Sequence, residues 1–235
     1  IYSLPYELTQ KYQIQRYGEH GISHSYLAER TAELLNRPLN ELKIITLHLG
    51  SGASVAAIKD GKAFDSSMGF TPLTGLTMGT RAGDVDPAIV PFLMEKEGMT
   101  AEEVMTLLND RSGLLGISES SSDMRDIEAA WQEGDRQASL AREIFINRVV
   151  KYVGAYFAEL GGIDALVLAG GIGEHQIDLR LALLKQLRVL GIEVDEKLNQ
   201  ANQEGIISPK DAQIKTMLIP TNEELQMVRQ IKKEI

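Results

Sequence analysis

The chain has 235 residues, of which 43% are hydrophobic, and this is enough for one large domain or two small ones. Its 33 acidic residues outnumber the 24 basic ones, so a surface with a net charge of −9 is expected to repel nucleic acids and anionic membranes. The absence of cysteine excludes disulfides and thiolate metal sites, and no apolar run approaches the roughly 20 residues of a membrane span. We therefore expect a cytoplasmic protein without a nucleic acid or a membrane as its partner.

The N-terminal segment is predicted to be a lead-in to the first helix. The chain does not begin with methionine and opens on a loop-like stretch, so we expect residues 1–20 to connect to a preceding domain of a longer protein. The first helix is predicted over 25–36. His20 and His24 have the spacing of helical metal ligands, but Gly21 between them argues against a helix there. A zinc site is therefore not expected.

Three strands are predicted to follow as an antiparallel meander. Residues 43–50 have the continuous apolar pattern of a buried strand. The segments 53–61 and 61–69 meet at Asp60-Gly61, which favours a two-residue hairpin turn.

A helical segment is predicted to interrupt the strands. Asp86 is expected to cap a helix that has Pro87 at its first position and ends at Gly98. Thr100 begins a capping box for a second helix. We therefore expect a helical insertion over about 82–135.

The C-terminal part alternates helices and strands. A long helix is predicted over 135–160, a strand over 164–170, a helix over 178–191 and a strand over 214–220. A meander followed by crossover units indicates an α/β fold with a mixed sheet flanked by helices. In outline this is the actin-like, ribonuclease-H-like arrangement.

Two glycine-rich turns are candidate phosphate or nucleotide contacts. In LHLGSGAS, Gly50 and Gly52 would supply positive φ angles and bare N–H groups, although a plain hairpin turn is the alternative. His48 precedes this turn inside the strand, where a half-buried structural role is the more common one. AGGIGE lacks the spacing of a dinucleotide motif and has no helix directly on its third glycine. Two such turns at strand ends favour ligand binding, because ligands of these sheets bind beyond the strand ends.

Two loops hold further polar candidates. Arg81 lies in TMGTRAGDVDP, where a guanidinium can grip a carboxylate or a phosphoryl group, and pairing with Asp84 or Asp86 is the alternative. The Ser and Asp residues of SSSDMRD (120–126) are also explained as helix caps.

The final helix is expected to begin at Thr221. Thr221 would be the N-cap of a capping box in which Glu224 reaches back to it. Glu223 then either faces the positive end of the helix dipole or binds a hard cation such as Mg²⁺. The residues alone leave both roles open.

Taken together, these segments resemble the acetate kinase family. The resemblance rests on RYGEHGISH, HLGSGAS, SMGFTPLTGLTMGTRAGDVDP, SSSDMRDI, AGGIGEH and PTNEEL, in this order. It covers essentially the whole chain and implies that residues 1–235 are the C-terminal, nucleotide-binding domain of such an enzyme. The family's kinship with sugar kinases, heat-shock chaperones and actin agrees with the sheet order derived above.

The resemblance implies a reversible reaction in which ATP and acetate give ADP and acetyl phosphate with Mg²⁺ or Mn²⁺. It implies that His20 stabilises the transferring phosphoryl group, that Arg81 holds acyl or phosphoryl oxygens, and that Glu223 binds the metal. The HLGSG turn would line the ATP phosphates and the GGIGEH turn the adenosine part. The implied nucleotide contacts are His48, Leu49, Gly50, Ser51, Gly52, Asp123, Met124, Arg125, Gly171, Ile172, Gly173, Glu174 and His175.

Three positions depart from the family pattern. Glu19 stands where the family usually has Phe, and Ser51 and His175 stand where it mostly has Asn. The last two differences touch the nucleotide contacts and not the type of reaction.

The resemblance also implies partners for this chain. The family's N-terminal domain carries a metal-binding Asn, a catalytic Asp and a second Arg, so we expect the chain alone to be inactive. A homodimer is implied as well, and helix 135–160 either contributes to it or is a core helix. The alternatives are a propionate or butyrate kinase and a non-catalytic, actin-like nucleotide-binding module.

Overall fold

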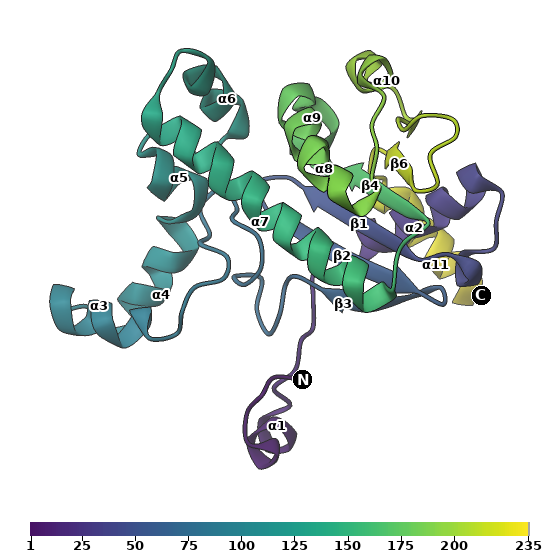
Figure 1. The fold of residues 1–235 in the computed structure, drawn as a ribbon. Coiled ribbons are helices and arrows are strands. Elements are labelled where there is room, and N and C mark those ends of the chain that lie inside the picture. Colours follow the sequence, from purple (N-terminus) through teal and green to yellow (C-terminus); the bar gives the residue numbers. More distant parts are fainter. Residues whose placement is uncertain (235) are drawn as a thin grey trace. The chain divides into compact units, whose positions relative to one another are not determined.

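The computed structural model describes residues 1–234 (Figure 1). The chain divides into two compact units. Unit 1 comprises Ile1–Glu19 and Ser67–Arg148, and unit 2 comprises His20–Ser66 and Val149–Ile235. Among the described residues, no helix is both long and apolar enough to span a bilayer. The predicted insertion at 82–135 falls inside unit 1, and the domain assignments stay predictions.

Unit 2 is built on one mixed sheet of six strands. The strand order is β3-β2-β1-β4-β6-β5. Strands β3, β2 and β1 are antiparallel, β1, β4 and β6 are parallel, and β5 returns antiparallel to β6. The predicted meander followed by crossover strands is confirmed, whereas the short edge strand β5 was not predicted. The strands are β1 Ile44–Leu49, β2 Ala53–Lys59, β3 Lys62–Ser66, β4 Ala165–Ala169, β5 Gly205–Ile206 and β6 Lys215–Leu218.

The hairpin between β2 and β3 has the predicted turn. Asp60 and Gly61 have φ angles of 53° and 73°. Positive φ at both central residues is the requirement of the type I′ turn, whose twist matches that of the flanking strands.

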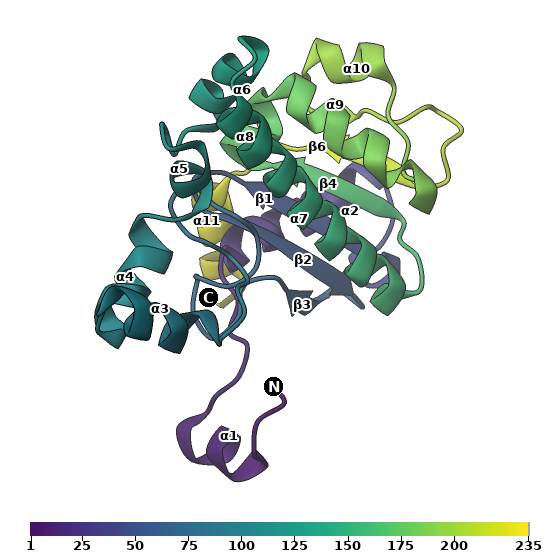
Figure 2. The ribbon, with the colours of Figure 1, turned by 60° about the vertical axis from the view of Figure 1, so that its left-hand side comes forward.

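Helices cover both faces of this sheet. Figure 2 shows α2 (Gly21–Leu35) and α11 (Glu223–Glu234) on one side of the strands and α8 (Gly170–His175) and α9 (Ile177–Gln186) on the other. Alternate residues of the strands, such as Ile44, Val167 and Met217, pack against α2 in one buried cluster. The shorter helices of unit 2 are η1 Leu39–Glu41, η2 Leu187–Leu190 and α10 Glu196–Ala201.

Helix α2 begins earlier than predicted. Its first residue is Gly21, and His20 precedes it with a φ of 57°. The argument that Gly21 excludes a helix was wrong, because glycine weakens the interior of a helix more than its first residue. His24 therefore lies on the first turn of α2. The predicted C-terminal end is confirmed by Asn36, which has a left-handed φ of 49°.

Unit 1 is helical. The N-terminal segment contains a helix that was predicted to be a loop, with Glu7 near its first turn and Lys11 near its last turn, where each charge favours the helix dipole. The capping box at Thr100 is confirmed, because Thr100 and Glu103 exchange both hydrogen bonds. The helices are α1 Tyr6–Tyr12, α3 Ile89–Glu97, α4 Ala101–Asp110, α5 Gly113–Ser118 and α6 Met124–Gln132.

Of the two predicted boundaries of helix α3 (Ile89–Glu97), the C-terminal one is confirmed and the N-terminal one is wrong. Helix α3 begins at Ile89 and not at Pro87, because the carboxylate of Asp86 accepts a hydrogen bond from the Ala88 N–H and holds the preceding turn. Its predicted end at Gly98 is confirmed by a φ of 68°. The long helix α7 (Arg136–Leu160) is confirmed and supplies residues to both units.

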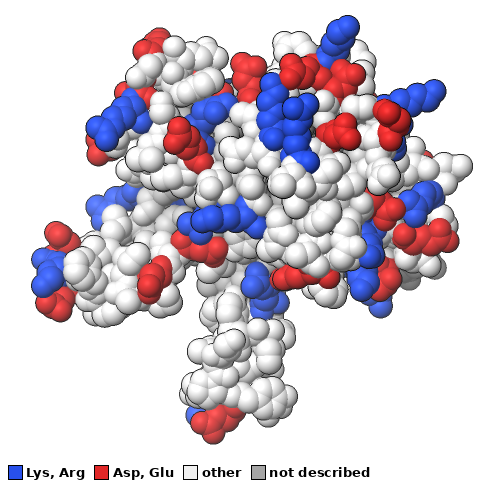
Figure 3. All heavy atoms as spheres, viewed as in Figure 1, with Lys and Arg blue, Asp and Glu red and all other residues white. Residues whose placement is uncertain are grey.

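The face shown in Figure 3 carries acidic and basic side chains side by side. No broad patch of either sign is visible on that face. This mixed distribution agrees with a modest net charge of −9 spread over the chain.

Candidate functional site

Three histidines of unit 2 meet where α2 begins beside β1 and β2. The rings of His20 and His48 stack with a centroid distance of 4.2 Å and an interplanar angle of 21°. The ring of His24 lies 6.4 Å from that of His20 and 6.5 Å from that of His48. His20 and His48, predicted from separate motifs, are therefore brought together, and His24 joins them.

Hydroxyl groups connect these rings. Ser54 Oγ lies 2.9 Å from His20 Nδ1 and 2.7 Å from His24 Nε2. Thr46 Oγ1 lies 2.7 Å from His24 Nδ1. The strand register explains this set, because His48 of β1 is directly opposite Ser54 of β2 and Thr46 lies two residues earlier on the same face. Helix α2 packs on that face and supplies the ring of His24, and His20 directly precedes the helix.

His48 has its own hydroxyl partner. Its Nδ1 lies 2.8 Å from Ser23 Oγ, which in turn lies 2.7 Å from Thr221 Oγ1. The start of α2, strand β1 and the segment before α11 are thus joined by side-chain hydrogen bonds.

Two of the three rings are neutral at pH 7. Burial lowers the pKa of His24 to about 3, with the nearby His48 and His20 adding to the effect. Burial lowers the pKa of His48 to about 4, and the repulsion that a protonated His20 would exert adds to the effect. A neutral imidazole has one N–H donor and one acceptor nitrogen, so each ring must be oriented by its hydrogen-bond partners.

The HLGSG turn differs in its conformation from the prediction. Neither Gly50 nor Gly52 is among the glycines with positive φ, so the expected reason for glycine at these positions was wrong. The Gly50 N–H instead donates to Gly52 O at 3.1 Å, and a Cβ on Gly50 would lie 3.3 Å from that oxygen. Tightness of the turn, not its φ angles, therefore favours glycine at position 50. Ser51 is exposed at the tip.

The GGIGEH segment is itself a short helix, α8. The expectation that no helix lies on its glycines was wrong, because α8 begins at Gly170. Gly170 has a φ of 78°, and a Cβ there would lie 2.6 Å from Leu49 O. This close approach places the two predicted nucleotide turns in direct contact. Gly171, in contrast, is exposed, and a Cβ on it would have no neighbouring atom within 4 Å.

Side chains of the same segment have different surroundings. The carboxylate of Glu174 accepts hydrogen bonds from Gly170 N at 2.9 Å and Thr221 N at 3.4 Å, so it ties α8 to the segment before α11. Ile172 is buried, whereas the ring of His175 is exposed.

Sequence reasoning missed Arg180, which holds the C-terminal end of α8. Its side chain is 1% exposed, and its guanidinium donates to the carbonyl oxygens of Gly173, Glu174 and Asn199 and to the side chains of Asn199 and Asn202. A basic residue inside the apolar pattern of DLRLALL was the available signal.

The start of α11 differs from the predicted capping box. Asn222 is the cap, because its side-chain oxygen accepts a hydrogen bond from Leu225 N at 3.0 Å. Thr221 is not the cap, since its hydroxyl bonds to Ser23 instead. Glu223 is therefore the first helical residue, and its carboxylate is exposed.

A metal would have Glu223 as its carboxylate ligand in this segment. Among the described residues no group of three His, Asp or Glu side chains is arranged to hold a metal ion. Mg²⁺ in phosphoryl-transfer sites is commonly held by one or two carboxylates together with substrate phosphates. The exposed carboxylates of Glu223 and the adjacent Glu224 fit that mode.

Arg81 belongs to unit 1, where its loop is tightly built. The Met78 N–H donates to Arg81 O, and the Leu114 N–H donates to Met78 O. A Cβ on Gly113 would overlap Met78 O. The Arg81 side chain is half-buried and lies 3.4 Å from Pro72 O.

The alternative of an Arg81 ion pair is not what the structure shows. Asp84 lies 3.6 Å from Arg148, and Asp86 holds the turn before α3. Within residues 1–234, the ion pairs do not include Arg81. Its guanidinium instead donates to Pro72 O and lies 3.6 Å from Met78 Sδ.

The SSSDMRD segment of unit 1 provides a helix cap. Asp123 caps α6 by accepting from Arg125 N at 2.9 Å, which confirms the cap interpretation for this residue. The Arg125 guanidinium lies 2.6 Å from the same carboxylate and lowers its pKa by hydrogen bonding. Met124 is 2% exposed as a whole residue and belongs to the core.

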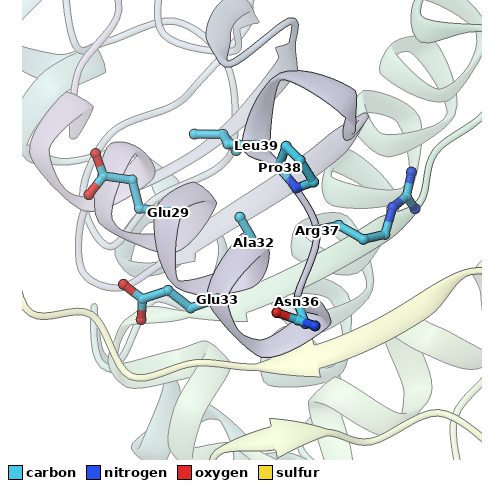
Figure 4. A pocket seen from close by; sticks show the side chains of 7 residues that line it. All are labelled: Glu29, Ala32, Glu33, Asn36, Arg37, Pro38 and Leu39. Carbon is cyan, nitrogen blue, oxygen red and sulfur yellow. The ribbon is translucent and has the colours of Figure 1, made fainter.

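A surface groove of about 660 Å³ at the C-terminal end of α2 contains none of these residues (Figure 4). His20 directly precedes α2, and the groove begins at Glu29, about 14 Å farther along the helix axis. Its charged side chains are paired, as in Arg37 with Asp164. The groove is lined by Glu29, Ala32, Glu33, Asn36, Arg37, Pro38 and Leu39.

The structure thus sorts the candidate residues into two sets. His20, the HLGSG and GGIGEH turns and Glu223 belong to unit 2, whereas Arg81 and Asp123 to Arg125 belong to unit 1. Within unit 2, the histidine cluster and the two turns are in contact through β1.

Comparisons with known proteins agree with this arrangement. An acetate kinase of Limosilactobacillus fermentum is 53% identical over 234 residues, and one of Moorella thermoacetica is 56% identical over 229 residues. These matches cover 99% and 97% of this chain and 59% and 58% of the relatives. The chain therefore spans somewhat less than two thirds of the length of the curated relatives it matches.

Solved structures show the same fold. A crystal structure of Porphyromonas gingivalis acetate kinase matches 99% of this chain and 59% of its own with a TM-score of 0.95 and 44% identity. A propionate kinase from Francisella tularensis matches 96% of this chain and 58% of its own with a TM-score of 0.90 and 43% identity. The expected actin-like fold of this kinase group is confirmed. The family model described as the acetokinase family matches residues 1–229, and the chain belongs to that family.

Proposed function

We propose that the complete protein transfers a phosphoryl group from ATP to acetate, giving acetyl phosphate and ADP reversibly. The observation that carries the proposal is identity above 50% to acetate kinases over nearly the whole chain. In this reaction the present chain supplies the nucleotide-binding domain and part of the catalytic groups.

The proposed mechanism places positive and hydrogen-bonding groups around the transferring phosphoryl group. Such a group carries charge on three equatorial oxygens, so catalysis depends mainly on positioning and electrostatic stabilisation. His20 donates a hydrogen bond to these oxygens, and Arg81 neutralises part of their charge. When bound at Glu223, Mg²⁺ or Mn²⁺ supplies further neutralisation of the phosphates.

The two glycine-rich turns form the proposed nucleotide site. His48, Leu49, Gly50, Ser51 and Gly52 line the phosphates, where bare backbone approaches closely. Asp123, Met124 and Arg125 are proposed as further nucleotide contacts of the complete protein. Gly171, Ile172, Gly173, Glu174 and His175 line the adenosine part. The exposed face of Gly171 supports this role, because no side chain covers it.

A longer acyl substrate is the second candidate. The Francisella tularensis relative is a propionate kinase, and its structure matches this chain nearly as well as that of the acetate kinase does. The choice between acetate, propionate and butyrate therefore needs a direct assay.

Further proposals concern assembly and location. We propose a cytoplasmic homodimer in which each copy combines this domain with an N-terminal domain. A measurement of molecular mass at micromolar concentration tests the dimer, and a clean monomer would count against it.

The activity itself is tested with protein expressed from the complete reading frame. ADP formation is measured with acetate, propionate and butyrate, and we expect acetate to give the highest kcat/KM. Arg81→Ala should lower the rate by about 10²–10³-fold, the usual cost of one electrostatic group at a transition state.

Arg111→Ala is the matched control, because Arg111 is an exposed residue at the end of α4 and should leave the rate unchanged. Absence of ADP formation with all three acids would contradict the proposed function. An unchanged rate in Arg81→Ala would contradict the role of Arg81 alone.

A further inference from the structure

A line of four side chains in unit 2 leads from the interior of β1 to the ring of His20. Thr46 Oγ1 lies 2.7 Å from His24 Nδ1, and His24 Nε2 lies 2.7 Å from Ser54 Oγ. The Ser54 oxygen also lies 2.9 Å from His20 Nδ1. Thr46 and Ser54 are 0% exposed and His24 is 5% exposed, so solvent does not compete for these hydrogen bonds.

The direction of these hydrogen bonds follows from counting their protons. A buried hydroxyl proton without an acceptor costs about 1–3 kcal/mol. Within the described residues, His24 Nδ1 is the one hydrogen-bond partner of the Thr46 hydroxyl, so Thr46 must donate to it. Neutral His24 then carries its single proton on Nε2 and donates it to Ser54 Oγ.

Ser54 is left with its own proton and one further partner. Having accepted from His24, its hydroxyl donates to His20 Nδ1. The reverse order would have His20 donate to Ser54, Ser54 to His24 and His24 to Thr46. It would leave the buried Thr46 proton without an acceptor.

We propose that Thr46, His24 and Ser54 are positioning residues that fix the tautomer of His20, with Nδ1 as an acceptor and the ring proton on Nε2. This inference deepens the proposed phosphoryl transfer and takes its functional meaning from it. Nε2–H is a donor that can stabilise phosphoryl oxygens, whereas the opposite tautomer presents a lone pair to the anion. Ser54 and Thr46 thus act on the reaction through His20 without touching the substrate.

The test removes the Thr46 hydroxyl, the group farthest from His20 in this line of hydrogen bonds, and observes the ring of His20. Thr46→Val removes the first hydroxyl and keeps the shape of the side chain, whereas Thr46→Ser keeps a hydroxyl. Thr216→Val is the matched control, because Thr216 is also a fully buried strand threonine but donates to Glu193 O instead. The readout is the ¹⁵N chemical shift of each ring nitrogen of His20 in selectively labelled protein.

We expect an unprotonated Nδ1 and a protonated Nε2 in the original protein, in Thr46→Ser and in Thr216→Val. In Thr46→Val both nitrogens should move toward averaged shifts, because the bias for one tautomer is lost. Ser54→Ala, which removes the last hydroxyl of the line, gives a second variant should Thr46→Val not fold. The kcat of Thr46→Val should fall about two- to tenfold with the fraction of competent tautomer, while the KM for ATP stays unchanged.

The outcomes separate this inference from the proposed function. A proton on His20 Nδ1 in the original protein, or identical His20 shifts in the original protein and in Thr46→Val, would overturn the tautomer assignment. The expected shifts in a protein that makes no acyl phosphate would support the assignment and contradict the proposed function.

Discussion

The buried His24 and the half-buried His48 make the stability of the chain depend on pH. Their pKa values, about 3 and about 4, lie below the ordinary value of 6.5, so between these limits the unfolded chain binds protons that the folded chain does not. Stability is therefore complete above pH 6.5 and is lost as the pH falls below it. From pH 7.5 to 5.5 the free energy of unfolding should fall by about 2–3 kcal/mol.

Urea unfolding followed by circular dichroism at the two pH values measures this difference. His175→Asn is the control, because the His175 ring is exposed and its removal should leave the difference unchanged. Equal stability at pH 7.5 and pH 5.5 would show that the two rings are not neutral in the folded state.

For single residues, the sequence indicated which residues matter better than it indicated their hydrogen-bond partners. Thr221 was predicted as a cap because it precedes an apolar helix with glutamates, but its hydroxyl bonds to Ser23, 198 residues earlier. Asn222 then takes the role of cap. Local sequence carries no signal for a partner this distant, whereas for Arg180 the basic residue in an apolar pattern was a signal that the prediction did not use. His20 and His48 could be predicted because each lies in a motif of its own.

Among the elements, the contact between α8 and the end of β1 depends on one glycine. Gly170→Ala would force a side chain into a positive φ of 78° and against Leu49 O at 2.6 Å, which cannot move without the strand. We expect a loss of about 2–4 kcal/mol in the free energy of unfolding. Chemical denaturation of the variant beside the original chain measures it.

Gly171→Ala is the matched control from the adjacent position. Its Cβ would meet nothing within 4 Å, so its stability should stay within about 0.5 kcal/mol of the original chain. If the nucleotide lies against this helix, Gly171→Ala should still weaken ADP binding. Equal stability of the two variants would show that the contact between Gly170 and Leu49 is not tight.

The elements that the sequence predicted are those with a long, regular pattern. Strands β1 and β4 and helix α7 follow from apolar periodicity alone, and the β2–β3 hairpin follows from its turn residues. Helix α8 has no such pattern, because three of its six residues are glycine. Contacts with residues outside the helix hold it instead: the Glu174 carboxylate accepts from Thr221 N, and Arg180 donates to Gly173 O near the helix end. Intrinsic propensity is a weak guide where the surroundings decide.

For the whole molecule, a mixed sheet of a meander and crossover strands could be predicted, but the edge strand β5 and the two units could not. The β-meander and crossover pattern gives the sheet, whereas the division joins Ile1–Glu19 with Ser67–Arg148, which are separated in sequence by part of unit 2. Motif order does not show which loops share a unit. The placement of Arg81 and Asp123 in unit 1, and of the other candidates in unit 2, required the structure.

The chain covers only part of the length of its relatives, and this leads to a prediction for the chain by itself. The two glycine-rich turns lie together in unit 2, so the isolated chain should bind ADP. Phosphoryl transfer also requires an acceptor held in line with the phosphate, and misplacement by about 1 Å can cost about 10²-fold. The resemblance assigns a catalytic Asp and a second Arg to the part of the relatives beyond the 59% that this chain covers.

Isothermal calorimetry with ADP and an acetyl phosphate assay, both on the isolated chain, measure the two halves of this prediction. We expect heat of ADP binding and a rate of acetyl phosphate formation at least about 10³-fold below that of the complete protein. Gly171→Ala in the same chain should reduce the ADP affinity without unfolding it, which ties the binding to α8. Robust acetyl phosphate synthesis by the chain alone would mean that unit 1 and unit 2 hold both substrates, and the assignment of acceptor binding to another domain would then be wrong.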